Sequence, residues 1–126
     1  MRILIDTHIL IWHLEDDAHL SLESSDLIAD PDNEVLVSIA SLWEIAIKLS
    51  KGKLAISKSI DDVVAHIEGS TSLLFAIEPE HLIHVASLPF HHRDPFDRLI
   101  IAQSLVENIP ILTSDSNFAV YGVELL

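Results

Sequence analysis

The sequence predicts an α/β sandwich built around a parallel sheet of about five strands. Short, continuously apolar runs of strand length alternate with longer stretches whose apolar residues recur at helical spacing. Strands of this kind are buried on both faces, as in a parallel sheet covered by helices. The chain has 126 residues, of which 49% are hydrophobic, enough for one core, and no repeat or Gly/Ser linker divides it. We therefore expect one domain over residues 1–126.

The expected strands and several helices can be placed directly on the sequence. The apolar runs of strand length are Ile3–Ile5, Glu34–Val37, Leu73–Ile77, Ile109–Leu112 and Gly122–Leu125. Four helices are expected near Thr7–Leu14, Leu22–Ala29, Ile60–Glu68 and Pro79–Ser87. Strands that alternate with helices in this way predict right-handed crossover connections in the sheet.

Two further helices have recognisable starting signals. Either Ser38 or Ser41 can cap a helix that runs towards Lys51 and stops at Gly52. An aspartate followed by proline at Asp94 opens the second helix, which continues to about residue 108.

The charge and composition of the chain limit its possible functions. Twenty carboxylates against seven Lys plus Arg give a formal net charge of −13, the wrong sign for holding nucleic acid by phosphate neutralisation alone. A nucleic-acid function would need bound cations or a basic partner, while simple solubility is the other interpretation. Cysteine is absent, so a metal would bind oxygen or imidazole. No segment reaches the roughly 18 apolar residues of a spanning helix, and we expect a cytoplasmic protein without membrane contact.

Four acidic residues lie where strands end or helices begin. Asp6 directly follows the first strand, and Asp115 follows the strand that ends at Leu112. Glu44 and Asp97 each lie in the first turns of a helix that begins near the same edge of the sheet. Because the carboxyl ends of parallel strands share one edge, these four carboxylates can converge although they are far apart in sequence.

Converging carboxylates repel one another unless a cation compensates their charge. Mg²⁺ or Mn²⁺ prefers oxygen ligands and often lies between carboxylates and a substrate phosphate, where it activates water for attack on a phosphodiester. Each acid also has a structural interpretation. Glu44 completes a capping box with Ser41, Asp97 favours the helix dipole, and Asp115 belongs to a turn. Asp6 is harder to explain structurally, because a carboxylate ending an apolar strand is costly to bury.

At these residues the sequence resembles the PIN-domain family and, within it, the VapC toxins. Four motifs carry the resemblance, in the family's order and over nearly the whole chain: Ile3-Leu4-Ile5-Asp6-Thr7-His8, Ser41-Leu42-Trp43-Glu44-Ile45-Ala46-Ile47-Lys48, Asp94-Pro95-Phe96-Asp97-Arg98-Leu99-Ile100-Ile101-Ala102 and Ile111-Leu112-Thr113-Ser114-Asp115. The first and last are common patterns on their own. The Trp-Glu and Asp-Pro-Phe-Asp-Arg blocks together are specific.

The resemblance implies an α/β/α fold and cleavage of RNA that depends on Mg²⁺ or Mn²⁺. By motif position, Asp6, Glu44 and Asp97 resemble the family's core acidic residues, with Asp115 as the fourth. Asp6 and Asp97 would hold the metal, and the other two would bind it directly or through water. The family also implies a homodimer and a VapB-type antitoxin, through which alone the complex binds promoter DNA. An acidic toxin is complementary to a basic antitoxin peptide.

Several residues near the motifs keep two interpretations. Thr7 and Ser114 could hold water or phosphate, or serve as helix caps. Arg98 could contact a phosphate or form a local ion pair, and Asp94 could join the site or only cap its helix. The histidines are expected to be solvated or packed, with His91 and His92 beside the site as the functional exception, and the cluster of Lys48, Lys51 and Lys53 is expected to be a solvated helix end rather than an RNA groove.

Two other functions compete with a nuclease. A catalytically silent PIN module could act only as a protein-binding partner, although its four retained acids argue against this. A phosphotransfer receiver-like domain would need a lysine near a late strand, and no lysine follows Lys58.

Overall fold

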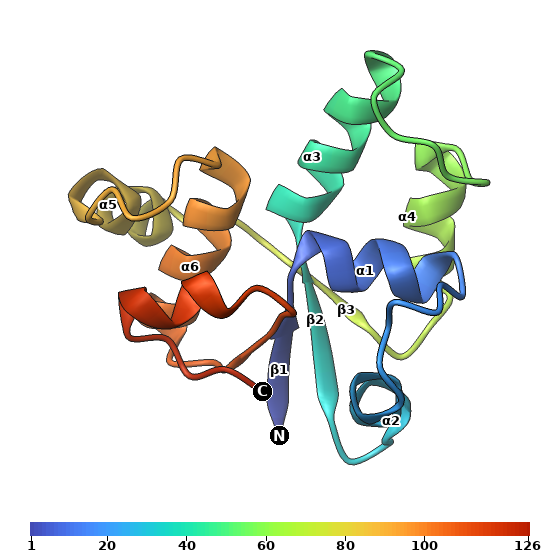
Figure 1. Ribbon diagram of the computed structural model, residues 1–126, viewed down its shortest axis with the longest axis horizontal. Coiled ribbons are helices and arrows are strands. Elements are labelled where there is room, and N and C mark those ends of the chain that lie inside the picture. The colour runs from blue at the N-terminus through green and yellow to red at the C-terminus, as the bar shows by residue number, and fades with distance from the viewer.

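The computed structural model describes residues 1–126 and contains one parallel sheet with helices on both faces (Figure 1). The strands lie in the order β3-β2-β1-β4. Their bounds are β1 Arg2–Ile5, β2 Glu34–Ser38, β3 Leu73–Phe75 and β4 Ile111–Leu112. Every pairing is parallel, with Leu4 of β1 opposite both Leu36 and Ile111. The predicted α/β sandwich with a parallel sheet is confirmed.

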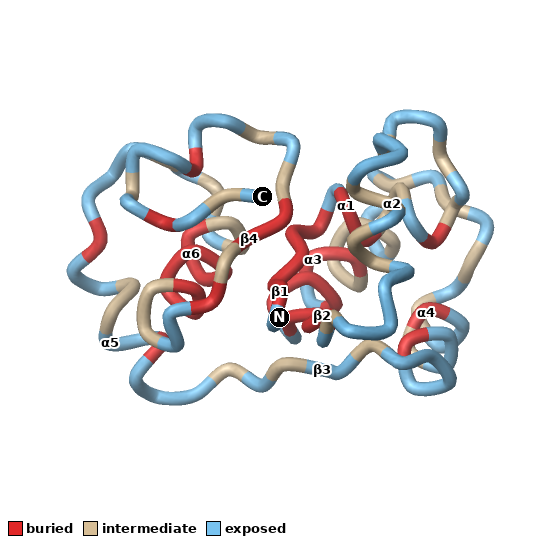
Figure 2. Tube along the Cα trace, turned by 90° about the horizontal axis from the view of Figure 1, so that it is seen from below, coloured by how far each residue is buried: buried red, intermediate tan, exposed pale blue.

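The sheet separates two hydrophobic cores of 12 buried residues each. Ile3, Ile5 and Val35 face the core formed with helices α1 (Thr7–Leu14), α3 (Ile39–Ser50) and α4 (Ile60–Glu68). Leu4 and Leu36 face the core formed with α6 (Pro95–Glu107) and the C-terminal segment. Successive side chains of a strand point to opposite faces, so a strand between two cores must be apolar at every position. Figure 2 shows the buried segments concentrated in β1, β2, β4, α3 and α6.

Six helices surround the sheet. Their bounds are α1 Thr7–Leu14, α2 Leu22–Ala29, α3 Ile39–Ser50, α4 Ile60–Glu68, α5 Pro79–Ser87 and α6 Pro95–Glu107. A short 3₁₀ helix, η1, covers Ser116–Tyr121. Helices α1, α2, α4 and α5 begin and end at the residues predicted from the sequence. No helix has both the length and the apolar character needed to cross a membrane.

The two helices that carry Glu44 and Asp97 begin at side-chain caps. Ser38, not Ser41, caps α3, since its hydroxyl accepts a hydrogen bond of 3.0 Å from the backbone N–H of Ala40. The Asp94 carboxylate caps α6 by accepting from the N–H groups of Phe96 and Asp97 at 2.9 and 3.0 Å. Both caps therefore fix the first turns in which the acidic residues lie.

The sheet has four strands instead of about five. The predicted strand Gly122–Leu125 is reduced to one isolated parallel bridge between Leu125 and Ile111. Its neighbour β4 is only two residues long, since Pro110 has no N–H for β1 and the N–H of Ile109 donates to the carbonyl of Ser104 instead of to the tail. The bridge itself uses the N–H of Ile111, which donates to the carbonyl of Glu124. The tail therefore finds too short a partner for a fifth strand.

Candidate metal centre

Asp6 lies at the carboxyl end of the central strand β1 and is 2% exposed. One carboxylate oxygen caps α1 by accepting from the N–H of Ile9 at 2.8 Å, and the other accepts from the hydroxyl of Thr113. Burial raises the pKa of Asp6 above its ordinary value, although both hydrogen bonds favour the charged form and oppose the shift. Asp6 is thus a buried carboxylate held in one orientation from two neighbouring elements.

Glu44 lies in the second turn of α3 and is also 2% exposed. Its Oε2 accepts from the ammonium of Lys48 at 2.5 Å, one helical turn along. Its Oε1 has no hydrogen-bond partner, and no other buried side-chain nitrogen or oxygen in the chain lacks one. Because α3 starts at Ile39, Ser41 lies inside the helix, so the capping-box interpretation of Glu44 is wrong.

Asp97 lies in the first turn of α6, beside Asp94. Burial raises the pKa of Asp97 to about 7, with further upward contributions from the carboxylates of Asp94, Glu44 and Asp6. The imidazole of His92 opposes the shift. The Asp97 carboxyl thus experiences the negative charges of three other acids of the cluster.

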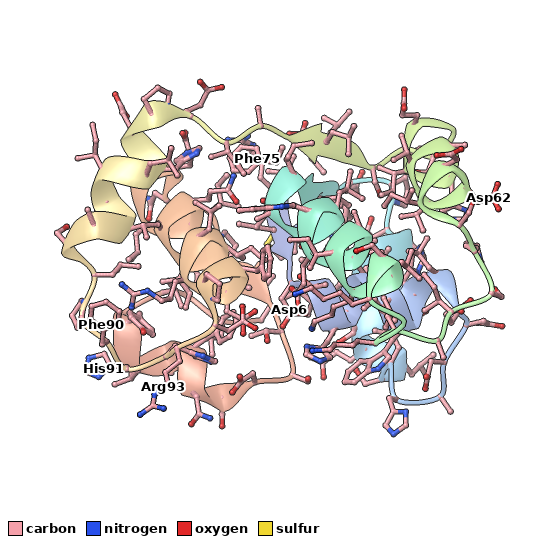
Figure 3. The ribbon with its side chains drawn as sticks, turned by 90° about the horizontal axis from the view of Figure 1, so that it is seen from above. Asp6, Asp62, Phe75, Phe90, His91 and Arg93 are labelled. Carbon is pink, nitrogen blue, oxygen red and sulfur yellow. The ribbon has the colours of Figure 1, made fainter.

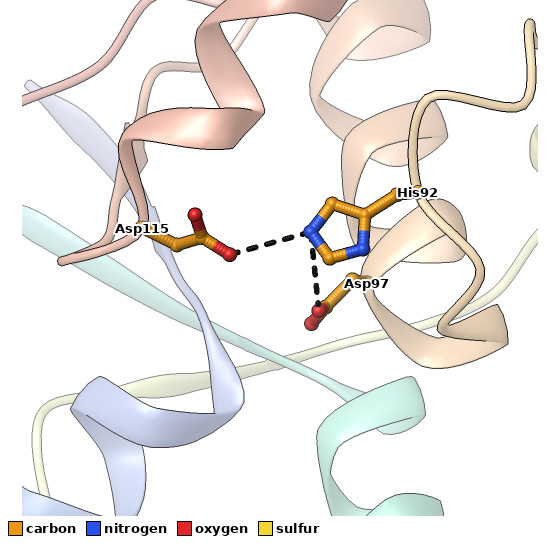
Figure 4. Close-up of side chains that lie close together, drawn as sticks. All are labelled: His92, Asp97 and Asp115. Carbon is orange, nitrogen blue, oxygen red and sulfur yellow. Dashed lines mark hydrogen bonds and ion pairs between the residues drawn. The ribbon is translucent and has the colours of Figure 1, made fainter.

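Asp115 caps η1 through a hydrogen bond of 2.9 Å from the N–H of Asn117. Its other oxygen lies 3.3 Å from Nε2 of His92, and the same nitrogen lies 3.9 Å from Asp97 (Figure 4). The N–H of Asp115 donates to the hydroxyl of Thr113, which itself donates to Asp6. Thr113 therefore connects two of the predicted acids.

The structure brings the acidic residues together in two overlapping groups. Glu44, Asp94 and Asp97 each offer an oxygen within 4.8 Å of the others, and so do the ligand atoms of His92, Asp97 and Asp115. Asp97 belongs to both groups. Asp6 belongs to neither, although its charge acts on Asp97 and that of Asp115 acts on Asp6.

These residues fit a hard divalent cation. The unpartnered Oε1 of Glu44 is a buried acceptor that lacks a donor, an arrangement that is rare in proteins and is relieved by a bound ion. The surrounding ligands are carboxylate oxygens with one imidazole, which suit Mg²⁺ or Mn²⁺. A cation would also offset the crowding of like charges that raises the pKa of Asp97.

The secondary candidates have different positions. The hydroxyl of Thr7 is buried and donates to the hydroxyl of Ser41 at 3.0 Å. Ser114 is exposed and its hydroxyl makes no hydrogen bond within the protein. The guanidinium of Arg98 is buried away from the acids, donates to three backbone carbonyls at 2.8 to 3.3 Å, and forms no ion pair. Asp94 both caps α6 and contributes to the cluster.

Sequence reasoning missed two residues of the site and undervalued a third. Lys48 is bound to Glu44 and is not a purely solvated helix end, and its i, i+4 spacing was the available signal. Thr113 connects Asp6 and Asp115, which no sequence pattern predicted. His92 lies between Asp97 and Asp115, which agrees with the interpretation of this histidine as a functional residue beside the site.

Several solved structures superpose on nearly the whole chain. The chain superposes on VapBC2 from Rickettsia felis bound to a promoter DNA fragment with a TM-score of 0.74 and 18% identity, covering 100% of this chain and 98% of that one. For DNA-bound VapBC from Salmonella typhimurium the TM-score is 0.70 at 14% identity, with 100% and 97% covered. For FitAcB from Neisseria gonorrhoeae it is 0.68 at 16% identity, with 98% and 96% covered.

At these identities the superpositions show a shared fold. The sequence has no significant match among curated proteins. The family model of the PIN domain, in contrast, matches residues 3–124 and so includes all four predicted acids. The chain therefore belongs to the PIN domain family.

Proposed function

We propose that the chain is a divalent-metal-dependent endoribonuclease and the toxin of a VapBC-type toxin–antitoxin pair in the cytoplasm. One observation supports this most strongly. Carboxylates of α3, α6 and the residue that caps η1 lie in two overlapping groups, the charge of the buried Asp6 acts on them, and the one unpartnered buried side-chain oxygen of the molecule lies among them. A purely structural cluster would satisfy that oxygen with a donor, because leaving it unpaired costs about 1–3 kcal/mol.

The residues of the cluster have separable roles in this proposal. Asp6 and Asp97 would hold Mg²⁺ or Mn²⁺, and Glu44 and Asp115 would hold it directly or through water. When bound, the ion would lower the pKa of a water molecule and neutralise charge on the phosphate that is cut. The chain orients its carboxylates in advance, because Asp6 is held by Ile9 and Thr113. The hydroxyls of Thr7 and Ser41 are hydrogen-bonded to each other. We propose water as the nucleophile.

We further propose a basic VapB-type antitoxin as the protein partner. The net charge of −13 favours a positively charged peptide. The superposable structures include VapBC complexes, some bound to DNA. In our proposal this chain meets promoter DNA only through its antitoxin, since its own charge disfavours direct contact with a phosphate backbone.

We also propose that the chain forms a homodimer through an exposed apolar face beside the site. Trp43 of α3 is 54% exposed and packs edge-on against the ring of Phe96 of α6 at 5.0 Å. Ile39, one turn before Trp43, is 36% exposed. Exposed aromatic and aliphatic groups that adjoin in this way are typical of protein interfaces. Sedimentation of the wild type and of Trp43→Ala tests the dimer.

Cleavage of labelled RNA by the purified protein tests the nuclease. We expect cleavage with Mg²⁺ or Mn²⁺, none in EDTA, and none by Asp97→Asn, while circular dichroism shows that the variant is folded. Thr7→Val, which removes a hydroxyl next to Asp6 and no carboxylate, is the matched control and should retain metal-dependent cleavage. Cleavage that persists in EDTA or in Asp97→Asn would contradict the proposal.

The catalytically silent PIN module is the alternative function. It predicts a protein that binds metal and a basic antitoxin peptide but cleaves no RNA under any metal condition. The four retained acids argue against this alternative, and the cleavage assay with Mg²⁺ or Mn²⁺ distinguishes the two functions.

A further inference from the structure

A hollow of about 460 Å³ lies next to the acidic cluster, between the loop that precedes α6 and the start of η1. Its lining residues are His91, His92, Arg93, Ser116, Asn117 and Val120. His92 belongs to both places, because it lines the hollow and its Nε2 lies 3.3 Å from Asp115. The hollow and the acidic cluster therefore adjoin each other at the side chain of His92.

The hollow is the one depression of the surface that no carboxylate lines. The other three are lined by acidic side chains, Glu23 in two of them and Glu124 in the third. In a chain with 20 carboxylates and 7 Lys plus Arg, a hollow that contains an arginine and two histidines and no acid differs sharply from its surroundings. Its lining suits an anion.

Arg93 is the arginine of the chain that has no partner. Arg2 pairs with Glu34 at 3.2 Å, and the buried guanidinium of Arg98 donates to backbone carbonyls. The side chain of Arg93 is exposed and makes no hydrogen bond or ion pair within the protein. Figure 3 shows it at the periphery of the molecule, beside His91 and Phe90. A free guanidinium is well suited to bind a phosphate through two parallel hydrogen bonds.

The imidazoles of the hollow are held in place by aromatic rings. His91 lies edge-on against Tyr121 with the ring centres 5.2 Å apart, and His92 lies edge-on against Phe118 at 5.5 Å. The side-chain amide of Asn117 and the hydroxyl of Ser116 form no hydrogen bonds within the protein and are available as donors. The hollow therefore offers ordered polar groups around one free positive charge.

Phe90 lies outside the lining of the hollow, on the same loop and three residues before Arg93. Its ring is 84% exposed and has the Arg98 guanidinium 4.1 Å from its centre on one side. This cation holds the ring in place and leaves most of its area open to a flat ligand. An exposed aromatic ring beside a free cation is the combination that binds single-stranded nucleic acid, with the base stacked and the phosphate paired.

We propose that this hollow binds a phosphate of single-stranded RNA, next to the phosphate that is cut, with Arg93 as its cationic contact and Phe90 as the stacking surface for a base. The inference rests on the proposed nuclease function and explains how so acidic a protein holds RNA. A metal ion held by the acidic cluster would neutralise the phosphate that is cut, and Arg93 would supply positive charge to the phosphate beside it. Unpaired nucleotides are required, because bases in a duplex cannot stack on Phe90.

Binding of a labelled single-stranded oligoribonucleotide, measured by fluorescence anisotropy in Ca²⁺ over a series of salt concentrations, tests the proposal. Arg93→Gln should weaken binding several-fold and reduce the slope of log affinity against log salt by about 0.7, the contribution of one phosphate contact on a single strand. Arg2→Gln removes the same charge at the start of β1, the end of the strand that is farther from Asp6. It should leave the slope of log affinity against log salt unchanged. Phe90→Ala should weaken binding at least about fivefold with an unchanged slope, because stacking releases no counterions.

The outcomes separate this inference from the nuclease proposal. If the wild type cleaves RNA but Arg93→Gln and Arg2→Gln have the same affinity and slope, the hollow is not a phosphate site and the nuclease proposal stands. If the wild type binds RNA in the expected way but cleaves none, the binding site stands and the nuclease proposal fails. Equal binding of a duplex RNA, or wild-type affinity in Phe90→Ala, would overturn the assignment of Phe90.

Discussion

Asp97 and Arg98 are neighbours on α6, yet they belong to two opposite kinds of buried polar cluster. Burial and, after it, the neighbouring carboxylates raise the pKa of Asp97, and the unpartnered oxygen of Glu44 lies in the same cluster. Arg98 faces the end of α5, where its guanidinium donates to the carbonyls of Val85, Leu88 and Pro89. The cluster around Asp97 contains repelling charges and an unpaired oxygen, whereas the polar groups around Arg98 are hydrogen-bonded.

The satisfied cluster continues along the buried side of α6. Gln103 donates to the carbonyl of Ala76 at 3.2 Å and accepts from the hydroxyl of Ser38 at 2.5 Å. Ser104 donates to the carbonyl of Ile109, and the fully buried His81 bonds to Glu107 through Nε2 at 3.1 Å. These bonds join α6 to the sheet, to its own C-terminus and to α5.

The difference indicates which polar groups serve the scaffold and which serve chemistry. A protein normally pairs its buried polar groups because an unpaired one is destabilising, and groups left in conflict concentrate at functional sites. On α6 the residue of the acidic cluster, Asp97, is directly followed by the residue of the scaffold, Arg98. Variants on the two sides should therefore affect different properties.

The largest effect should come from neutralising Asp97. Asp97→Asn removes a carboxylate from both groups of residues that could hold a metal ion and should reduce metal-dependent RNA cleavage at least about a thousandfold, since a catalytic ion would contribute several kcal/mol. The variant should be at least as stable as the wild type without metal, because it relieves charge repulsion. Initial rates with Mn²⁺ and urea unfolding in EDTA measure the two quantities. Reduced stability with retained activity would reverse the assignment.

The opposite pattern should follow from replacing Arg98. Arg98→Met leaves the carbonyls of Leu88 and Pro89 without their side-chain donor, removes one of the two donors to the carbonyl of Val85, and should lower the free energy of unfolding by about 3 kcal/mol. Cleavage per folded molecule should fall much less than in Asp97→Asn. Arg98→Lys, which keeps the charge but not the planar guanidinium, serves as the control and should be intermediate in stability. An unchanged unfolding midpoint in Arg98→Met would show that these bonds do not hold α5.

The stability of the metal-free protein should depend on pH through Asp97. Its pKa is about 7 in the folded chain against an ordinary 3.8, so the folded state binds more protons than the unfolded state between these values. The free energy of unfolding should therefore fall as pH rises from about 4 to 7 and become constant above that range. Asp6, whose pKa is also raised, contributes with the same sign.

Urea unfolding in EDTA at a series of pH values, compared between the wild type and Asp97→Asn, isolates this contribution. The wild type should lose stability relative to the variant as pH rises, and Mn²⁺ should restore more stability at pH 8 than at pH 5. Parallel profiles for the two proteins would mean that Asp97 ionises as an ordinary exposed carboxyl does.

The smallest effect should come from one bond of the satisfied cluster. Ser104→Ala removes the hydroxyl that donates to the carbonyl of Ile109 and should cost about 1 kcal/mol of unfolding free energy. Metal affinity should not change, because Ser104 lies at the far end of α6 from the acids. A calorimetric metal titration and a thermal melt check both statements, and a change in metal affinity would argue that the two clusters are coupled.

Much of the fold could be predicted from local sequence signals. The apolar strands and the caps at Ser38 and Asp94 depend on residues close together in the chain, so their elements were placed within a few residues. The fifth strand was wrong because its existence depended on the length of a distant partner, β4, and hence on Pro110. Pairing between segments is a tertiary property that local patterns do not contain.

In the candidate site, too, some features could be predicted from the sequence and others depend on tertiary packing. The parallel sheet predicted that Asp6 and Asp115 emerge at one edge, and both do. The direction of Arg98, the bond from Thr113 to Asp6 and the position of His92 between two acids depend on how α6, the loop before it and η1 pack together. Residue type alone could not distinguish Arg98, which is buried in the scaffold, from Arg93, which is free beside the site.

Calorimetric titration of Mn²⁺ into the metal-free wild type and into Asp6→Asn tests the central claim most directly, because it requires no choice of RNA. Circular dichroism confirms that both proteins are folded, and the variant controls for diffuse binding to an acidic surface. We predict saturable binding in the wild type that is lost or strongly weakened in Asp6→Asn. Equal binding in the two proteins, or none in either, would contradict a metal centre among these carboxylates.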